Sequence, residues 1–395
     1  MKIKKILALI PALIILIFPF FSQAYNIQDY IKTTYNRYSK HFDKNGWHYN
    51  QPNYSIDNKY PNTAREWSMF ASYYYNRLDN QKTKIQIKAA LNNAILELQA
   101  RPTITQSFND SIAHYLIYQQ KNLFSKEEKE IYYSQVKESL FARVNINDSE
   151  NRGIIAGVLD SYLANKLYFD KQIDRQQYKF LIKRNKQKIS KSINQCIDEN
   201  DWYFEGDQKY FSTHYHVLSA YLLMFYSDYF NNEKYLDLSK KMTSNIRKLT
   251  FQNGFIEAKI GMRPIGLGAQ TYLMLGILNK RFNHKDYSVY LNYVKPRFFN
   301  DKASPNRLEF HSTMIDTEPN YHDDIGFSLI AEISKNDNKI INTKFKKEIN
   351  RINLKNNSYQ DKRFTIKNNG GIIIINNKEY QLATNGDYSR IFTIK

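Results

Sequence analysis

Apolar residues recur along most of the chain at three- and four-residue spacing, in stretches of about 15 residues separated by polar connections. This spacing places the apolar side chains on one face of a helix. The pattern predicts helices over residues 27–40, 63–78, 83–99, 107–120, 126–141, 150–167, 174–195, 212–228, 233–248, 265–279, 285–297 and 323–335. Taken in order, these helices form about six consecutive pairs.

The two members of each pair differ in polarity. The second member is rich in small and apolar residues, as in "GIIAGVLDSYLANKL", whereas the first carries more lysine and glutamate, as in "KEEKEIYYSQVKESL". Helices that are apolar on nearly every face are buried, and helices with a charged stripe lie outside. The alternation predicts a mostly α fold, an incomplete or complete (α/α)6 toroid, over residues 25–350. An open solenoid is the structural alternative, but the pairs show no clear fixed-period repeat.

The two ends of the chain differ from this helical body. Residues 1–24 have a basic start, a long apolar run and a small-residue ending, which predicts a signal peptide and export to the periplasm or the medium. An uncleaved membrane anchor is the alternative for this run. Residues 360–395 contain short β-branched runs with Gly-Gly and Asn-Gly between them, and predict a small C-terminal β-hairpin appendage.

Composition narrows the classes of partner. Cys196 is the single cysteine, which excludes an intrachain disulfide and a cysteine-based metal site, and no cofactor is expected. The formal net charge of +19 favours polyanionic partners, although codon usage rich in Lys, Asn and Ile is another source of such a charge. Because the exported chain has no recognisable nucleic-acid module, we expect an acidic polysaccharide as partner rather than nucleic acid. A membrane is expected as partner only if the signal peptide is not cleaved.

Candidate chemistry lies at the predicted starts of the inner helices, which line one mouth of a toroid. The polar residues there are Arg65, Glu66, Asn109, Asp110, Asn151, Arg152, His214, Tyr215, His216, Arg263, His322, Asp323 and Asp324. Ordinary helix capping is the preferred interpretation for the residues at 109, 110, 323 and 324.

Residues at two of these starts match the needs of β-elimination on a uronic acid. The reaction removes the proton at C5, so neutral or cationic donors must first engage the neighbouring carboxylate. Asn151 and Arg152 suit that task. Tyr215, in the run "FSTHYHVLSAYLLMF", can act as base and then as acid if nearby cations lower its pKa from about 10.

The segment "DWYFEGDQKYFSTHYHVLSAYLLMFYSDYF" resembles alginate lyases with an α/α toroid fold, in which a His-Tyr-His run precedes an apolar inner helix. "ENRGIIAGVLDSYLANKLY" is similar to the preceding inner helix of those enzymes, whose start carries an Asn-His element. The resemblance covers about residues 145–245. It implies that Tyr215 is the catalytic acid and base and that Asn151 neutralises the substrate carboxylate.

The chain departs from this family at two positions. Arg152 stands where the family has a histidine, and Gln208, with Lys209 beside it, stands where the family has an arginine. Arg152 can neutralise a carboxylate but is a poor base, because it stays protonated. His214 and His216 are candidates to tune Tyr215 or to bind a sugar hydroxyl, but two residues apart they cannot face the same way, so one is expected to be structural.

These observations lead to one preferred function and two alternatives. We expect an exported polysaccharide lyase that cleaves an acidic, alginate-like glycan without a metal, with Tyr215, Asn151, Arg152 and His214 as catalytic residues. The substrate-binding candidates are His216, Lys209, Gln208, Arg65, Arg263 and Trp47. One alternative is a glycoside hydrolase on the same fold that uses Glu66 with Asp110 or Asp324. The other is a non-catalytic protein that binds acidic glycans, motivated by the departures at Arg152 and Gln208.

Overall fold

A computed structural model describes residues 84–85, 88–89, 91–93, 95–96, 108–143, 150–205, 210–248, 250, 269–284 and 290, and five short strands between 358 and 394. Within these residues, no helix has the length and apolarity needed to cross a bilayer. The predicted signal peptide lies outside the described part, and so do the helices predicted at 27–40, 63–78 and 323–335.

The described helices follow the predicted ranges closely. They are α6 (Phe108–Tyr118), α7 (Lys126–Arg143), α8 (Glu150–Phe169), α9 (Arg175–Cys196), α10 (Thr213–Phe230), α11 (Glu233–Lys248) and α12 (Ala269–Arg281), with a 3-10 turn η5 (Lys121–Leu123). Each helix begins and ends within four residues of its predicted range. The apolar periodicity of the sequence was therefore a sufficient guide to these elements.

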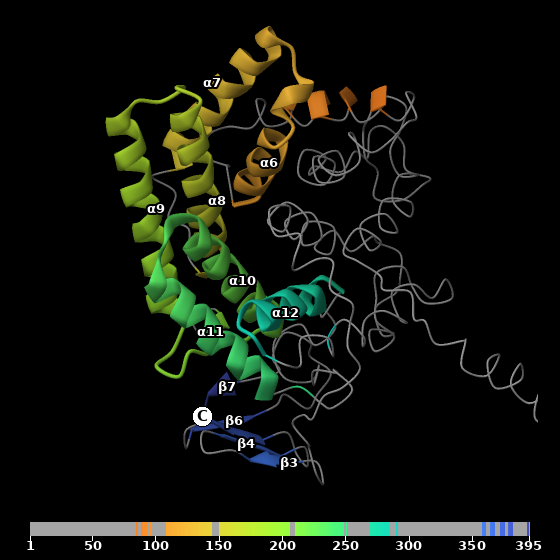
Figure 1. The fold of residues 1–395 in the computed structure, drawn as a ribbon. Coiled ribbons are helices and arrows are strands. Elements are labelled where there is room, and N and C mark those ends of the chain that lie inside the picture. Colours follow the sequence, from red (N-terminus) through yellow and green to blue (C-terminus); the bar gives the residue numbers. More distant parts are fainter. Residues whose placement is uncertain are drawn as a thin grey trace, which may run out of the picture.

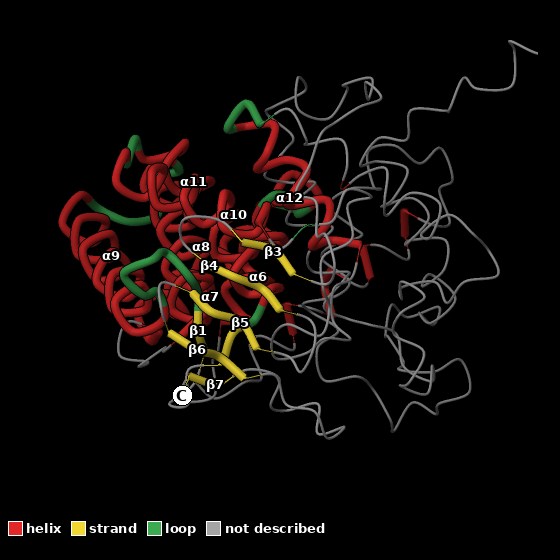
Figure 2. The backbone as a smooth tube through the Cα atoms, turned by 90° about the horizontal axis from the view of Figure 1, so that it is seen from below, coloured by secondary structure: helices red, strands yellow, loops and turns green. Residues whose placement is uncertain are grey.

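The helices form two layers. In the inner layer α6 contacts α8, α8 contacts α10 and α10 contacts α12, while α7 and α9 pack against α8 and α11 packs against α10. Figures 1 and 2 both place α9 on the outside, farther than α8 from α6 and α12. The predicted alternation of outer and inner helices is confirmed. The fold is the mostly α, layered α/α architecture of a toroid.

Inner helices α6, α8 and α10 run parallel. Near the end of α8, the Asn165 side-chain amide donates to the Tyr229 hydroxyl near the end of α10, over 2.6 Å. Likewise, Tyr118 at the end of α6 donates to Asp170, which directly follows α8. Helices whose last turns meet, and which pack side by side, point in the same direction.

The same holds for α10 and α12. At their ends, Arg281 and Asp228 form an ion pair of 2.6 Å, and at their starts the Nδ1 atom of His214 lies 3.0 Å from the Thr271 hydroxyl. All four inner helices of the described part therefore begin at one end of the layer. This is the arrangement that the toroid prediction required for a single mouth.

Local sequence explains where several helices start and stop. The Ser212 hydroxyl accepts a hydrogen bond from the backbone N–H of Tyr215 and caps the start of α10. Asp174 and Gln177 form a reciprocal capping box at the start of α9. Helix α10 ends at Asn231, whose backbone is left-handed, with φ of 52°.

Buried polar contacts join α7, α8 and α9. The Arg143 guanidinium forms two hydrogen bonds with the Asp160 carboxylate, of 3.2 and 2.8 Å, and both side chains are almost wholly buried. The Lys188 ammonium donates to the backbone carbonyl of Arg143 over 2.5 Å. Helices α8 and α9 approach closely at Gly157, where an added Cβ would lie 2.6 Å from Cγ1 of Ile189. A glycine is therefore required at this crossing.

In the part of the chain that the structure describes, strands occur in two places. Strands β1 (Phe204–Glu205) and β2 (Tyr210–Phe211) form an antiparallel pair between α9 and α10. At the C-terminus, β3 (Ser358–Gln360), β4 (Phe364–Lys367), β5 (Ile372–Ile375), β6 (Lys378–Gln381) and β7 (Thr393–Ile394) form an antiparallel sheet in sequence order. The predicted β character of the tail is confirmed, and its described strands form a five-stranded meander.

Candidate functional site

The first turn of α10 carries Tyr215 at the end where the inner helices begin. Its side chain is half-buried and packs against the hydrophobic core. The ring centroids of Tyr215 and His214 are 5.2 Å apart, and the two rings are tilted by 59°. Tyr215 thus combines a packed ring with partial exposure, as a residue that meets a substrate at a helix start requires.

His214 connects α10 to α12. Its side chain is half-buried, and its Nδ1 atom lies 3.0 Å from the hydroxyl of Thr271, which is fully buried in the first turns of α12. This contact fixes the position of the imidazole beside Tyr215.

His216 is a core residue. The backbone N–H of Tyr203 donates to its Nδ1 atom over 3.1 Å, so the proton of the neutral ring lies on Nε2, which donates to the Met242 carbonyl over 2.8 Å. Burial lowers the pKa of His216 to about 4, against the opposing effect of the Met242 hydrogen bond. The predicted substrate-binding role of His216 is wrong, because both ring nitrogens are engaged within the protein and the side chain is fully buried. His216 is the structural histidine expected of the pair, and it packs beside buried Trp202.

Asn151 and Arg152 lie in the first turn of α8, at the same end as Tyr215. Residue 151 precedes Asn165 by 14 residues, and Tyr215 precedes Tyr229 by 14 residues. That separation is almost four helical turns and about 21 Å along each helix. Positions 151 and 215 are therefore about equally far along their helices from the contact between Asn165 and Tyr229. The Arg152 side chain is exposed.

Helix starts of the kind assembled at this end favour anions. The first N–H groups of a helix point outward and carry the positive end of the helix dipole. Four inner helices begin at this end, and Arg152 adds a permanent positive charge there. The acidic residue Asp110 also lies in the first turn of α6, but it is only 1% exposed. It lies inside the helix rather than at the cap position that the sequence suggested.

Several predicted residues fall outside the described part of the chain. Gln208 and Lys209 belong to the connection between β1 and β2, which leads directly to α10. Outside it also lie Trp47, Arg65, Glu66, Arg263 and Asp324. Their predicted roles stay predictions. Among the described residues, no group of three His, Cys, Asp or Glu side chains is placed to hold a metal ion.

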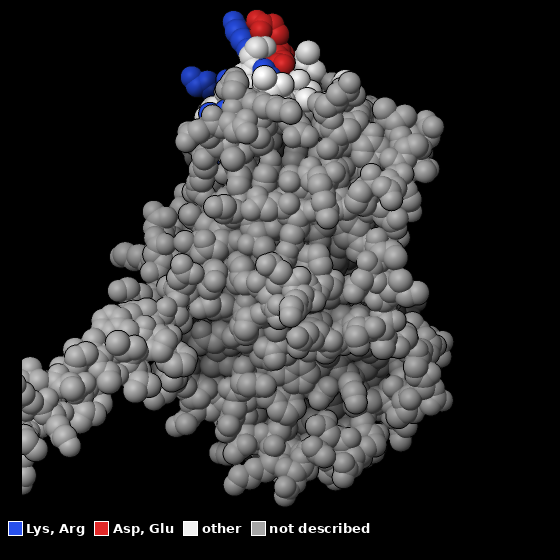
Figure 3. Space-filling model, turned by 90° about the vertical axis from the view of Figure 1, so that its right-hand side faces the viewer, with Lys and Arg blue, Asp and Glu red and all other residues white. Residues whose placement is uncertain are grey.

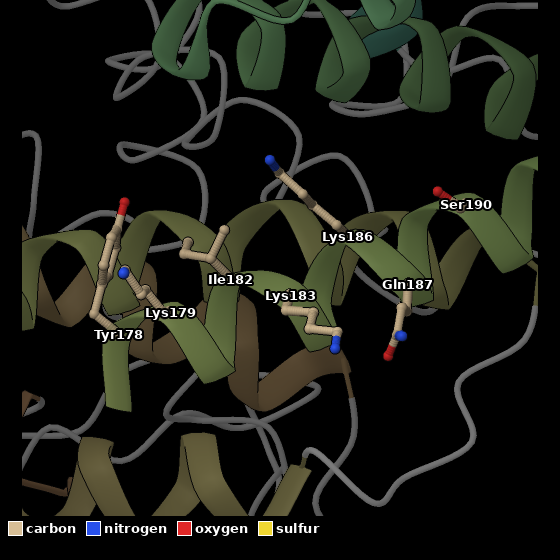
Figure 4. Close-up of a pocket in the computed structure, with 7 residues that line it drawn as sticks. All are labelled: Tyr178, Lys179, Ile182, Lys183, Lys186, Gln187 and Ser190. Atoms are coloured by element: carbon tan, nitrogen blue, oxygen red, sulfur yellow. The ribbon is translucent and has the colours of Figure 1, made fainter. Parts of the chain in front are cut away.

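The structure also shows a feature that the sequence analysis did not single out. An open groove of about 570 Å³ runs along α9 and is lined by Tyr178, Lys179, Ile182, Lys183, Lys186, Gln187 and Ser190 (Figure 4). The signal in the sequence was the composition of this helix, which has seven Lys and Arg residues and neither Asp nor Glu.

Comparisons with known proteins find similarity at the level of structure. No protein-family model matches the chain, and no curated protein sequence matches it significantly. A GH76 alpha-1,6-mannanase from Salegentibacter sp. HEL1_6 aligns over 78% of this chain and 98% of its own, with a TM-score of 0.47 and 15% identity. An inactive variant of that mannanase in complex with alpha-1,6-mannotetrose aligns over 78% and 97%, with a TM-score of 0.46 and 14% identity.

A third solved structure is an unsaturated glucuronyl hydrolase with the oligosaccharide dGlcA-Glc-Rha-Glc. It aligns over 80% of this chain and 96% of its own, with a TM-score of 0.46 and 11% identity. These neighbours are α/α toroid enzymes that act on glycans. At such low identities the similarity is one of helical arrangement, and it assigns no activity to this chain.

Proposed function

We propose that this protein is an enzyme that acts on an acidic glycan at the end of the toroid where its inner helices begin. One observation carries the proposal: the parallel inner helices bring Arg152, His214 and Tyr215 to the same end as four helix N-termini. The helix starts and the Arg152 guanidinium favour a carboxylate ligand. Tyr215 is the half-buried acid–base group beside them.

The preferred reaction is β-elimination at a uronic acid. Asn151 and Arg152 neutralise the carboxylate, which makes the C5 proton more acidic. Tyr215 removes that proton, the bond between C4 and the glycosidic oxygen breaks, and a double bond forms between C4 and C5. The glycosidic oxygen takes a proton, which Tyr215 can return. Cations near the phenol favour its ionised form, and the first turn of a helix has the same effect.

Hydrolysis is the second candidate. The observation that favours hydrolysis is the position of Asp110. This carboxylic acid lies in the first turn of inner helix α6, at the same end as Tyr215. Glycoside hydrolases use two carboxyl groups, and the sequence offers Glu66 or Asp324 as the partner of Asp110. It is also the type of reaction of the enzymes named above. Elimination is preferred because Tyr215 is partly exposed, whereas the Asp110 side chain is almost wholly buried.

The two reactions leave different products. The purified chain is incubated with alginate, pectate, hyaluronan, heparan and glucuronan, and each digest is assayed for new reducing ends and for ultraviolet absorbance of a conjugated double bond. Elimination yields both signals, and hydrolysis yields reducing ends alone. If no acidic glycan is cleaved, the proposal of an enzyme fails and the non-catalytic binding protein replaces it.

The role of Tyr215 is tested by Tyr215→Phe, with Tyr229→Phe as matched control. Both changes remove one hydroxyl from α10, but Tyr229 lies at the opposite end of the helix, where it accepts from Asn165. We expect Tyr215→Phe to lower kcat by roughly 100- to 10,000-fold, with glycan affinity retained, because only the proton transfer is lost. Tyr229→Phe is expected to stay active. A fully active Tyr215→Phe variant would exclude Tyr215 as the acid–base residue.

A further inference from the structure

Helix α9 presents an uncommon concentration of positive charge on the outer layer. Over 22 residues it carries seven basic side chains and no acidic one. These are Arg175, Lys179, Lys183, Arg184, Lys186, Lys188 and Lys191. Lys188 is buried against α7, so six of the seven remain for the surface. By contrast, glutamates are interspersed among the lysines of outer helix α7.

Three of these lysines lie on the wall of the groove. Lys179, Lys183 and Lys186 are spaced by four and three residues, which places them on one face of α9, with rises of about 6 and 4.5 Å. In Figure 4 the ammonium group of Lys186 extends from one edge of the helix and that of Lys183 from the other. The groove therefore has positive charge on both sides.

Within the described part of the chain, no carboxylate forms an ion pair with these three lysines. All three lysine side chains are exposed, and no salt bridge to them occurs among the described residues. The described surface in Figure 3 differs, because there basic and acidic side chains lie next to one another. An unneutralised row of ammonium groups in a concave surface attracts a chain of negative charges.

Neutral groups between the lysines define the chemistry further. The Tyr178 and Ser190 hydroxyls and the Gln187 amide line the same groove, beside the apolar side chain of Ile182. Hydroxyls and amides can pair with sugar hydroxyl groups, while the ammonium groups pair with carboxylates or sulfates. We propose that the α9 groove is an accessory binding site for an acidic polysaccharide chain. The choice of a glycan rests on the function proposed above.

Other polyanions fit the groove less well. Single-stranded nucleic acids bind through aromatic rings on which bases stack. Tyr178 is the one aromatic residue among those that line the groove, and it already stacks on Tyr168, with centroids 4.9 Å apart and planes at 20°. An extended, hydroxyl-rich chain with one charge on each unit satisfies both the shape and the lining.

The groove begins at the end of the layer opposite to the candidate catalytic end. Tyr178 contacts Tyr168 in the last turn of α8, which is the end opposite to Arg152. From there the lining runs along α9 to Ser190, 12 residues later or about 18 Å. A polymer held in this groove lies on the outer layer while another part of the same chain reaches the starts of the inner helices. Two linked contacts raise the overall affinity for a long polymer over that for a short one.

The test replaces Lys179, Lys183 and Lys186 together by glutamine in the full chain. The matched control replaces three lysines of α7 by glutamine, Lys126, Lys129 and Lys137. Both variants carry Tyr215→Phe, so that the glycan is not cleaved during titration. Affinities are measured for long alginate, a short alginate oligosaccharide, neutral dextran, phosphatidylglycerol vesicles and an oligothymidylate.

We expect the α9 variant to lose roughly tenfold in affinity for long alginate, and much less for the short oligosaccharide, while the α7 control keeps its affinity. Added salt should weaken the wild-type interaction and reduce this difference. Equal alginate affinity in the two variants would overturn the proposal, and so would a loss confined to vesicles or oligothymidylate. The same lysine changes without Tyr215→Phe show whether cleavage persists. If no variant cleaves any glycan, the proposed function fails, but the affinity comparison still decides the groove.

Discussion

The ion pair between Arg143 and Asp160 offers the sharpest test of how the three helices α7, α8 and α9 are held together. The change is Asp160→Asn, which keeps the size of the side chain and removes its charge. In the folded protein the guanidinium is 0% exposed and the carboxylate 2%. The Arg143 guanidinium also donates to the Ser139 hydroxyl. With asparagine at position 160, the positive charge of Arg143 therefore stays in the protein interior without the Asp160 carboxylate.

The expected cost follows from this burial. Removing one partner of a buried ion pair costs about 3 to 5 kcal/mol, because the remaining charge has lost both its hydration and its partner. Asparagine still offers one acceptor oxygen to the guanidinium, so we expect the lower part of this range, about 3 kcal/mol. With an m-value of about 3 kcal/mol/M, the urea midpoint would fall by about 1 M.

Urea unfolding followed by tryptophan fluorescence measures this change. The control is Asp228→Asn, which breaks an ion pair with Arg281 that is more than one third exposed on both sides. Because solvent screens that pair, its loss should cost no more than about 1 kcal/mol. Replacing Arg143 by methionine and Asp160 by leucine together should restore most of the stability, since neither charge of this pair is then left in the interior. A loss below about 1 kcal/mol for Asp160→Asn would refute the reasoning.

Three further changes test other parts of the structure. Gly157→Ala should destabilise the fold by about 1 to 3 kcal/mol in urea unfolding, since the new methyl group would lie 2.6 Å from Cγ1 of Ile189; a gain in stability, as helix propensity alone predicts, would contradict this packing. Burial lowers the pKa of His216 from 6.5 to about 4, so between these pH values the unfolded chain takes up a proton that the folded chain refuses, and stability should fall as the pH drops from 6.5 to 4. His216→Asn should remove this part of the pH dependence, and an unchanged slope would contradict the assignment. Thr271→Val should release the His214 ring, lowering kcat about tenfold and shifting its pH profile with little change in the urea midpoint; unaltered kinetics would show that this contact does not position the site.

The sequence was sufficient for the helical elements because their signals are local. Apolar spacing located α10 and α11, and the cap residue Ser212 stands at the boundary where α10 begins. The outer and inner layers were also predictable, since α7 carries its charges in its own sequence and α8 is apolar on most faces. The parallel direction of the inner helices followed from their alternation with outer ones.

Properties that depend on contacts between elements were not predictable in this way. His216 belongs to the core because the backbone of Tyr203 and that of Met242 meet its two nitrogens, and those partners lie 13 residues before it and 26 residues after it. The basic residues of α9 can be counted in the sequence, but whether the described carboxylates reach Lys179, Lys183 and Lys186 depends on which surfaces pack against α9. The close approach at Gly157 likewise requires the position of Ile189 on the next helix.

The layering of the fold explains why a His-Tyr-His run serves two purposes. Successive residues of a helix point about 100° apart, so three consecutive side chains cannot share one surface. His214 reaches α12 in the inner layer, and His216 reaches α11 in the outer layer, which leaves Tyr215 between them and half-exposed. Because His216 remains neutral above about pH 4, it supplies no positive charge to the phenol at neutral pH.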